Sequence, residues 1–189
     1  MKQFSIVKHK IKLLGFLSLL FIAAYGMNSC VTLPEGITPV TNFKQEEYLG
    51  KWYEIARLDH SFERGLSNVS AEYSIREGGG IKVLNRGYNR EKKEWKEAEG
   101  KAFFVKESDI GHLKVSFFGP FYGSYVVFNL DEEDYKHAYI TSYNRDFLWF
   151  LSRSPNVTET EKNRFLKKVE KLGFDVDGLI FVDHGEKMD

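Results

Sequence analysis

The sequence has one cysteine, no net charge and none of the common catalytic motifs. A single cysteine cannot form an internal disulfide, so the fold must depend on its core alone. The charges balance, with 27 basic and 27 acidic residues. This composition does not favour nucleic-acid binding, because nucleic-acid-binding domains usually carry an excess of basic residues. The length of 189 residues fits one domain.

Catalytic and metal-binding patterns are also missing from the sequence. The five histidines are scattered along the chain without metal-ligand spacing. There is no G-x-S-x-G motif, no P-loop and no G-x-G-x-x-G after a strand. We therefore expect no catalytic residues, no metal and no cofactor, and predict that the protein is not an enzyme.

The first thirty residues differ in kind from the rest. Four lysines precede the apolar run Leu13–Ala24, and no acidic residue occurs before Glu35. A basic stretch followed by a short apolar run is typical of a secretory signal, and this run is shorter than the ~20 residues of a transmembrane helix. We predict a signal peptide over 1–29; an uncleaved anchor is the alternative.

Cys30 ends the stretch "MNSC", which resembles the lipobox of bacterial lipoproteins, although Met27 and Asn28 depart from the usual pattern. The resemblance implies that Cys30 carries a diacylglycerol anchor and a palmitate, and three acyl chains would anchor the protein firmly. A free thiol is the alternative. No Asp follows Cys30, which in lipoproteins favours the outer membrane. Residues 30–42 are expected to be the lipidated Cys and a short tether.

The remaining chain has a β-rich composition, with 16 Phe and 10 Tyr. Short alternating runs separated by turn residues predict an antiparallel meander of eight strands. We expect them at about 52–59, 69–76, 81–88, 94–105, 112–118, 124–130, 137–143 and 147–153, with turns at 78–80 and 119–123.

After residue 155 the period changes to that of a helix. Thr158 and Glu161 fit a capping box, and Gly173 is placed to end the helix. We predict an amphipathic α-helix over 158–172 and a short final strand at 178–182. Eight meandering strands indicate a closed, all-β up-and-down barrel, because closure removes exposed edges. Such a barrel has room for one small ligand, with the helix packed outside.

Three stretches in order resemble the motifs of the lipocalin family: "GKWYEIAR" (50–57), "YGSYVVFNLDEEDYKHAYI" (122–140) and "LWFLSR" (148–153). The segments 58–65, 114–123 and 173–182 are similar to its branch of bacterial outer-membrane lipoproteins, which is related to apolipoprotein D. The resemblance covers 43–184 and leaves 185–189 as a tail.

The resemblance implies a calyx that binds, stores or transports a lysophospholipid or fatty acid without catalysis. It also implies that the protein is a monomer or homodimer at the periplasmic face of the outer membrane. No nucleic-acid partner is expected. A haem or bilin chromophore is the alternative ligand.

Trp52 opens the first strand and Arg153 ends the eighth, so both lie at the same end of the meander. The resemblance implies that the guanidinium stacks on the indole to close the barrel floor, an interaction of ~0.5–2 kcal/mol. Gly50 would let the entering chain turn across that floor. A core Trp and an unrelated surface Arg are the alternative.

Glu54 presents a separate question. Strand alternation places it inward with Trp52 and Ala56, where an isolated carboxylate would be costly. It would either pair with Arg153 or a nearby Tyr, or make a polar contact deep in the ligand cavity.

The loops at the other end carry apolar residues, including Phe62, Phe121 and Tyr122. Such residues often mark a binding surface, and we interpret them as a lipid portal or membrane-facing rim; packing among themselves is the alternative. Alternation predicts ligand-lining side chains at Trp149, Tyr73, Ala98, Ala102, Phe104, Val115, Phe117, Tyr125 and Tyr143. It does not fix the facing of Tyr125 and Tyr143, and each of the nine residues could be plain core.

Overall fold

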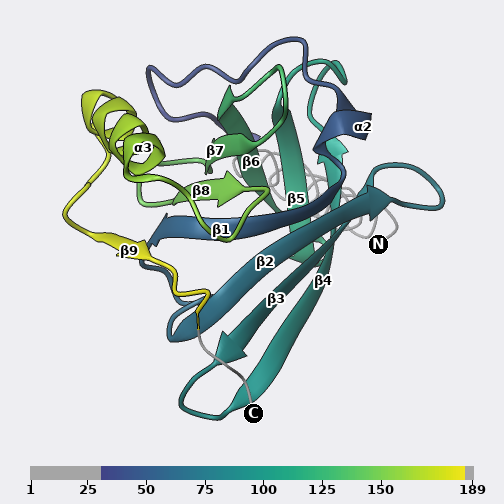
Figure 1. Ribbon diagram of the computed structural model, residues 1–189. Helices are drawn as coiled ribbons and strands as arrows, with labels where there is room; N and C mark the ends of the chain where they lie inside the picture. Colours follow the sequence, from purple (N-terminus) through teal and green to yellow (C-terminus); the bar gives the residue numbers. More distant parts are fainter. Residues whose placement is uncertain (1–30, 186–189) are drawn as a thin grey trace, which may run out of the picture. The chain divides into compact units, whose positions relative to one another are not determined.

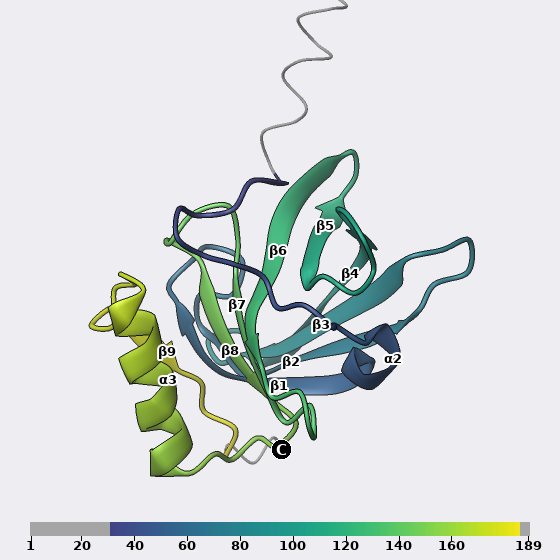
Figure 2. The ribbon, with the colours of Figure 1, turned by 90° about the horizontal axis from the view of Figure 1, so that it is seen from above.

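The computed structural model describes residues 31–185, which form an antiparallel β-barrel (Figure 1). The predicted signal peptide and Cys30 lie outside the described residues. The strands are β1 (Gly50–Leu58), β2 (Leu66–Ile75), β3 (Ile81–Asn89), β4 (Glu94–Phe104), β5 (His112–Phe118), β6 (Phe121–Leu130), β7 (His137–Thr141) and β8 (Leu148–Ser152). Each strand pairs with the next, and β1 pairs with both β2 and β8. The predicted closed eight-stranded barrel is therefore confirmed (Figure 2).

Turn chemistry explains most of the strand boundaries. Gly78, Gly79 and Gly80 all have positive φ, as the predicted β2–β3 turn requires. The predicted turn over 119–123 is wrong, because β6 begins at Phe121. Phe118 pairs directly with Phe121 and the ladder continues through Gly123, so only Gly119 and Pro120 make the turn.

The strand predicted over 137–143 ends early, at Thr141. The Thr141 hydroxyl donates to the carbonyl oxygens of Asn144 (3.2 Å) and Phe147 (2.7 Å), which folds residues 142–147 into a loop. Tyr143 therefore lies in that loop rather than in the barrel wall, and its side chain is 44% exposed.

The α-helix α3 (Glu159–Lys171) packs on the outside of the barrel (Figures 1 and 2). Its predicted capping box is present, with Thr158 and Glu161 bonded reciprocally. Phe165 and Val169 are fully buried against an outer core that includes Tyr139 and Phe150. The barrel thus has a second apolar core beneath the helix, separate from the one inside.

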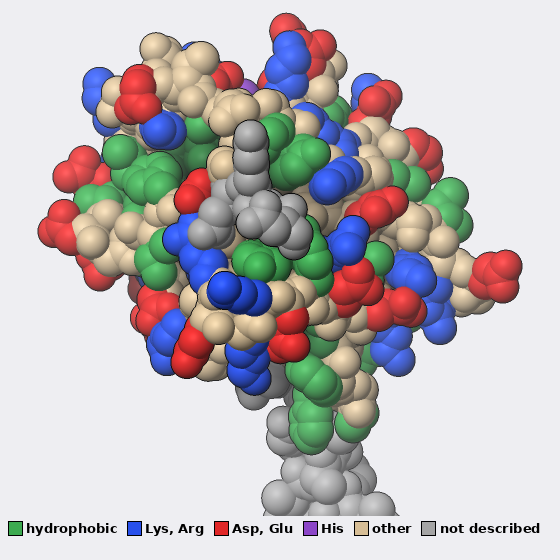
Figure 3. Space-filling model, turned by 60° about the horizontal axis from the view of Figure 1, so that its bottom comes forward, with side chains coloured by type: hydrophobic (Ala, Val, Ile, Leu, Met, Phe, Trp, Pro, Cys, Tyr) green, Lys and Arg blue, Asp and Glu red, His purple; other side chains and the backbone are tan. Residues whose placement is uncertain are grey.

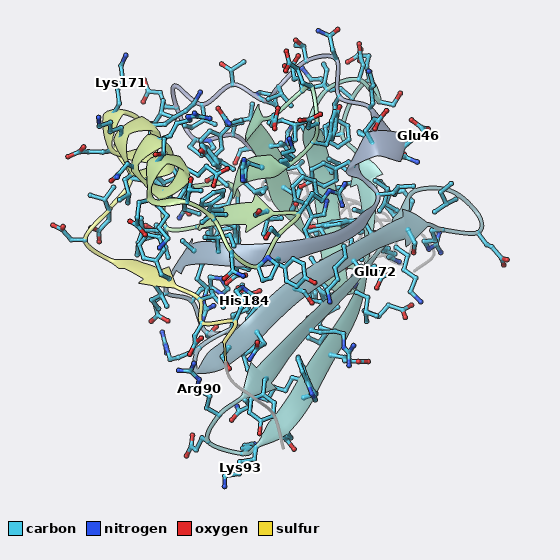
Figure 4. All side chains as sticks on the ribbon, in the orientation of Figure 1. Glu46, Glu72, Arg90, Lys93, Lys171 and His184 are labelled. Atoms are coloured by element: carbon cyan, nitrogen blue, oxygen red, sulfur yellow. The ribbon has the colours of Figure 1, made fainter. Side chains whose placement is uncertain are left out.

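The short strand β9 (Leu179–Phe181) pairs with the second half of β1, from Ala56 to Leu58. The first half of β1 pairs with β2, from Gly50 to Tyr53. Residues after β9 continue between the two strands: Val182 N donates to Ile55 O (2.9 Å), and Asn68 N donates to Asp183 O (2.8 Å). His184 lies beside β1, with its Nε2 2.8 Å from Glu54 O (Figure 4). The C-terminal segment therefore fills the place where β1 and β2 separate.

Part of the chain before β1, within the predicted tether, contacts the barrel. Ile37 is buried in the outer core. Val40 N donates to Val127 O (2.9 Å), and Gly111 N donates to Val40 O (2.8 Å). A short helix that the sequence did not predict, α2 (Gln45–Tyr48), follows and places Tyr48 against the inner core.

Candidate ligand site inside the barrel

The closed end of the barrel is organised by Arg153. Its guanidinium carbon lies 3.9 Å from the centroid of the Trp52 ring. The same side chain donates to the carbonyl oxygens of Tyr135 (3.2 Å), Lys51 (2.9 Å) and Glu47 (2.6 Å). Trp52 is fully buried, and its Nε1 donates to Tyr48 O (2.8 Å). The stack joins α2, β1 and the β6–β7 connection into one floor.

Three tyrosines form a hydrogen-bonded group above this floor. The Tyr125 hydroxyl lies 2.7 Å from that of Tyr48 and 2.8 Å from that of Tyr73. Burial raises the pKa of all three phenols above the ordinary value. The group is therefore neutral near pH 7 and offers hydroxyls rather than charge to a bound molecule.

A β-bulge in β1 changes which residues face inward. The register with β8 shifts between Glu54, opposite Leu151, and Ala56, opposite Phe150. Ala56 consequently joins the outer core beneath α3, so its predicted inward position is wrong. Arg57, opposite Trp149, faces inward instead and is 1% exposed.

The bulge brings Glu54 and Arg57 together inside the barrel, with Oε1 of Glu54 2.7 Å from Nη1 of Arg57. Glu54 therefore pairs with Arg57, and not with Arg153 or a tyrosine as the sequence predicted. Arg57 Nη2 also donates to Glu63 O (2.8 Å). Glu63 Oε2 accepts from Trp149 Nε1 (3.1 Å) and lies 3.0 Å from His60 Nε2.

We refer to Glu54, Arg57, His60, Glu63 and Trp149 as the polar cluster. Burial raises the pKa of Glu54 well above its usual range, and the nearby Glu63 charge adds to this shift. Burial opposes ionisation of Glu63 too, but contacts with His60 and Trp149 and the Arg57 charge outweigh it and lower its pKa. Arg57 Nε and His60 Nδ1 have no hydrogen-bond partner among residues 31–185. Arg57 opposes the shift at Glu54, but burial outweighs it, so the pKa is raised at Glu54 and lowered at Glu63. Arg57 Nε retains free donor capacity.

The interior wall contains most of the predicted ligand-lining residues. The seven that contribute to the inner core are Tyr73, Ala102, Phe104, Val115, Phe117, Tyr125 and Trp149. Phe104, Val115, Phe117 and Trp149 face inward yet keep intermediate solvent exposure. Since side chains that fill a closed core are normally excluded from water, this exposure indicates that the interior is open near these residues.

Two predicted ligand-lining residues lie elsewhere. Ala98 is on the inner side of β4 but exposed, because β4 pairs with β5 only between Lys101 and Phe104. The β3–β4 hairpin extends beyond that pairing, with Lys93 at its tip (Figure 4). Tyr143 lies in the 142–147 loop, where its ring packs on Phe147 at 5.3 Å.

The predicted portal residues separate into two groups. Phe62 is 71% exposed beside His60, and its ring stacks on Phe147 with 6.4 Å between centroids. Phe121 is 79% exposed at the β5–β6 turn. Tyr122 lies on the outer wall, with Lys101 and Lys114 over its ring, and its role in a portal stays a prediction. Strand alternation missed Arg57, whose facing depends on the bulge, and Glu63, which lies in the 59–65 loop.

A closed eight-stranded up-and-down barrel, with a helix outside and a partly open interior, defines a calyx-type small-molecule-binding protein. The chain belongs to the lipocalin family: residues 43–184 match the lipocalin-like domain.

Relatives support this assignment at high identity. "Outer membrane lipoprotein Blc" of Vibrio cholerae is 56% identical over 86% of this chain and 95% of its own length. The Escherichia coli K12 protein of the same name is 50% identical over 82% of this chain and 86% of its own length. Mouse apolipoprotein D is 30% identical over 90% of this chain and 92% of its own length. The predicted branch of the family and the predicted outer-membrane location are confirmed.

Solved structures show the same fold at low sequence identity. Insecticyanin from the tobacco hornworm Manduca sexta superposes with a TM-score of 0.65 at 19% identity, over 83% of this chain and 89% of that one. Within residues 31–185, no helix has the length and apolar character to cross a membrane. The same residues contain no group of three or more His, Cys, Asp or Glu placed to hold a metal ion.

Proposed function

We propose that the barrel binds one single-chain lipid, a lysophospholipid or a fatty acid, without catalysis, and stores or transports it at the outer membrane. The observation that carries this proposal is the partial exposure of inward-facing apolar residues on β4, β5 and β8. An acyl chain that covered them would gain ~25 cal/mol per Å² of apolar surface removed from water.

The polar cluster supports a lipid with a polar head. It lies where β1 and β8 approach the 59–65 loop, next to the exposed Phe62. Arg57 Nε and His60 Nδ1 have no hydrogen-bond partner among residues 31–185. Either nitrogen could form a hydrogen bond with a phosphate or carboxylate group of the lipid head. In this arrangement the acyl chain would point toward the tyrosine group, and the head would remain near the polar cluster.

The cellular setting follows from the relatives and from the N-terminal sequence. We place the protein at the periplasmic face of the outer membrane, held by acyl chains on Cys30. Phe62 and Phe121 would form part of the entrance for the lipid, and either a monomer or a homodimer would serve.

Native mass spectrometry of the full chain purified from its membrane tests the proposal. We expect one lysophospholipid or fatty acid per chain. A chain without bound lipid that also rejects added lysophospholipid would contradict the proposal. An absorbing chromophore in place of lipid would favour a haem- or bilin-type ligand instead.

Tryptophan fluorescence then tests where the lipid lies. We expect added lysophospholipid to change the emission of the full chain through Trp149 at the polar cluster. Trp149→Phe should remove most of this change. Trp95→Phe is the matched control, since Trp95 lies on the outer side of β4 against Tyr88 and should leave the change intact. Equal responses in the two variants would place the lipid outside the barrel.

A further inference from the structure

A second candidate site lies on the outer wall of the barrel, where it also reaches the edge of the inward-facing Phe117. A hollow of about 280 Å³ opens over β3, β4 and β5. Three cations, Arg76, Lys82 and Lys101, and one carboxylate, Glu99, border it. Lys82 and Glu99 are paired at 2.8 Å. Neither Arg76 nor Lys101 has a carboxylate partner among residues 31–185, so the hollow has an uncompensated positive charge.

Ser116 provides an independent sign that the hollow accepts a ligand. It is 4% exposed and lines the hollow, and its Oγ has no hydrogen-bond partner among the described residues. A buried hydroxyl without a partner is unfavourable. A ligand oxygen that accepted its hydrogen bond would remove this cost.

The cations around the hollow are held in place by aromatic rings. Nζ of Lys101 and Nζ of Lys114 lie 5.9 and 5.3 Å from the centroid of the same Tyr122 ring. Cζ of Arg76 lies 5.9 Å from the centroid of Phe103. Two ammonium groups over one ring repel each other, and an anion bound nearby would offset that repulsion. A multiply charged anion would therefore be attracted to these side chains.

We propose that this hollow binds a phosphate group, with Lys101, Arg76 and the Ser116 hydroxyl as its principal contacts. The ligand is either free phosphate or the phosphate of a membrane lipid. Gly119, which borders the hollow, lies in the β5–β6 turn between Phe118 and Phe121, which are 80% and 79% exposed. Elsewhere too the surface mixes the two kinds of side chain: on the face drawn in Figure 3, apolar side chains lie among charged ones. A lipid phosphate in the hollow would thus bring two aromatic rings to the membrane surface.

Amide chemical shifts of the full chain in a neutral detergent test this site. One titration uses inorganic phosphate against an equal ionic strength of chloride, and a second adds phosphatidylglycerol to the micelles. We expect saturable shifts at Ser116 and Gly119. Shifts with inorganic phosphate would identify a site for free phosphate, and shifts with phosphatidylglycerol alone would identify a lipid source; both support the proposal. No shift in either titration would overturn it.

Matched variants separate a built site from general charge attraction. Lys101→Gln should weaken the interaction about tenfold, as expected for a charged hydrogen-bonding partner, and Ser116→Ala should weaken it severalfold. Lys96→Gln removes the same charge from an exposed position of β4 outside the hollow and should have little effect. If Lys96→Gln and Lys101→Gln weakened phosphate binding equally, the binding would depend on the net charge of the protein and not on a specific site. Ser116 lies between the inward-facing Val115 and Phe117, so its amide can also respond to lipid inside the barrel. Loss of the shift in Lys101→Gln, whose side chain is on the outer wall, therefore assigns the response to the hollow.

Discussion

At the residue scale, Arg153 has the largest structural role at the closed end. It donates to three carbonyl oxygens and stacks on a fully buried indole. Arg153→Ala would leave these carbonyls without the donor and expose the face of Trp52. We expect a loss of about 2–4 kcal/mol in the free energy of unfolding, measured by urea denaturation. Arg164→Ala, an exposed arginine on α3, should change it by less than about 0.5 kcal/mol. Similar losses in both variants would contradict the role assigned to Arg153.

Glu54 gives a prediction about pH. Burial and the Glu63 charge raise its pKa in the folded state, so the folded chain holds this proton more tightly than the unfolded chain. Stability from Glu54 is complete below the ordinary carboxyl pKa of about 4.3 and is lost as pH rises through the raised value. Glu54→Gln keeps an acceptor for Arg57 and cannot lose a proton. We expect its stability relative to the native chain to increase from pH 5 to pH 8.

Urea midpoints at both pH values measure this difference. Glu72→Gln removes a carboxylate from an exposed position on β2 (Figure 4) and should show no comparable trend. A Glu54→Gln variant whose relative stability is constant or falls with pH would show that Glu54 is ionised in the folded protein.

The positions of single residues could be predicted only where strand alternation is unbroken. Successive strands of a meander run in opposite directions, which predicted Trp52 and Arg153 at the same end of the barrel. In the structure, Cζ of Arg153 lies 3.9 Å from the centroid of the Trp52 ring. Arg57 could not be found in the same way, because a one-residue bulge reverses the facing of the β1 residues from Ala56 onward. Glu63 lies in the 59–65 loop, where alternation gives no prediction. The inward Arg57 that the bulge produces is held by contacts outside the strand ladder, with Glu54 Oε1 and with Glu63 O in the 59–65 loop. The bulge leaves no pattern within β1 itself.

At the scale of elements, α3 shows local signals that determine structure. The reciprocal bonds between Thr158 and Glu161 satisfy backbone donors at the start of the helix. Thr158→Ala removes the side-chain acceptor and should lower the free energy of unfolding by about 1 kcal/mol. Thr160→Ala, in the same first turn but outside the capping box, should change it little. Thermal denaturation of both variants checks this, and equal effects would contradict the capping role.

Elements with less local information were predicted less well. The short α2 has no capping side chain and is held by contacts of Tyr48 with Tyr73 and Trp52. β6 begins at Phe121 because of cross-strand pairing with Phe118, which outweighs the turn-forming appearance of the sequence 119–123. In both cases tertiary contacts decide the conformation, and a single sequence does not display them.

At the scale of the whole molecule, the barrel contains two kinds of apolar region. The outer core beneath α3 is closely packed, with Phe150, Phe165 and Val169 each 0% exposed. On the inner side of β4, β5 and β8, four side chains instead keep intermediate exposure: Phe104, Val115, Phe117 and Trp149. The sequence predicted that both regions are apolar but could not distinguish them. The alternation of a strand shows which side each residue faces, and it carries no information on how tightly that side is packed. The floor and the outer core are thus excluded from water, whereas the upper interior is available for a ligand.

Filling the interior tests this division directly. Val115→Phe adds a ring to an inward-facing position with intermediate exposure, opposite Ala102. If the interior is open there, the ring will enter existing space, so the free energy of unfolding should stay within about 1 kcal/mol of the native value while lysophospholipid binding falls at least tenfold. A filled interior would instead be overpacked, at a cost of about 1–3 kcal/mol. Urea denaturation and lipid titration of the same variant measure both quantities. Loss of stability without loss of lipid binding would show that the ligand does not occupy the barrel.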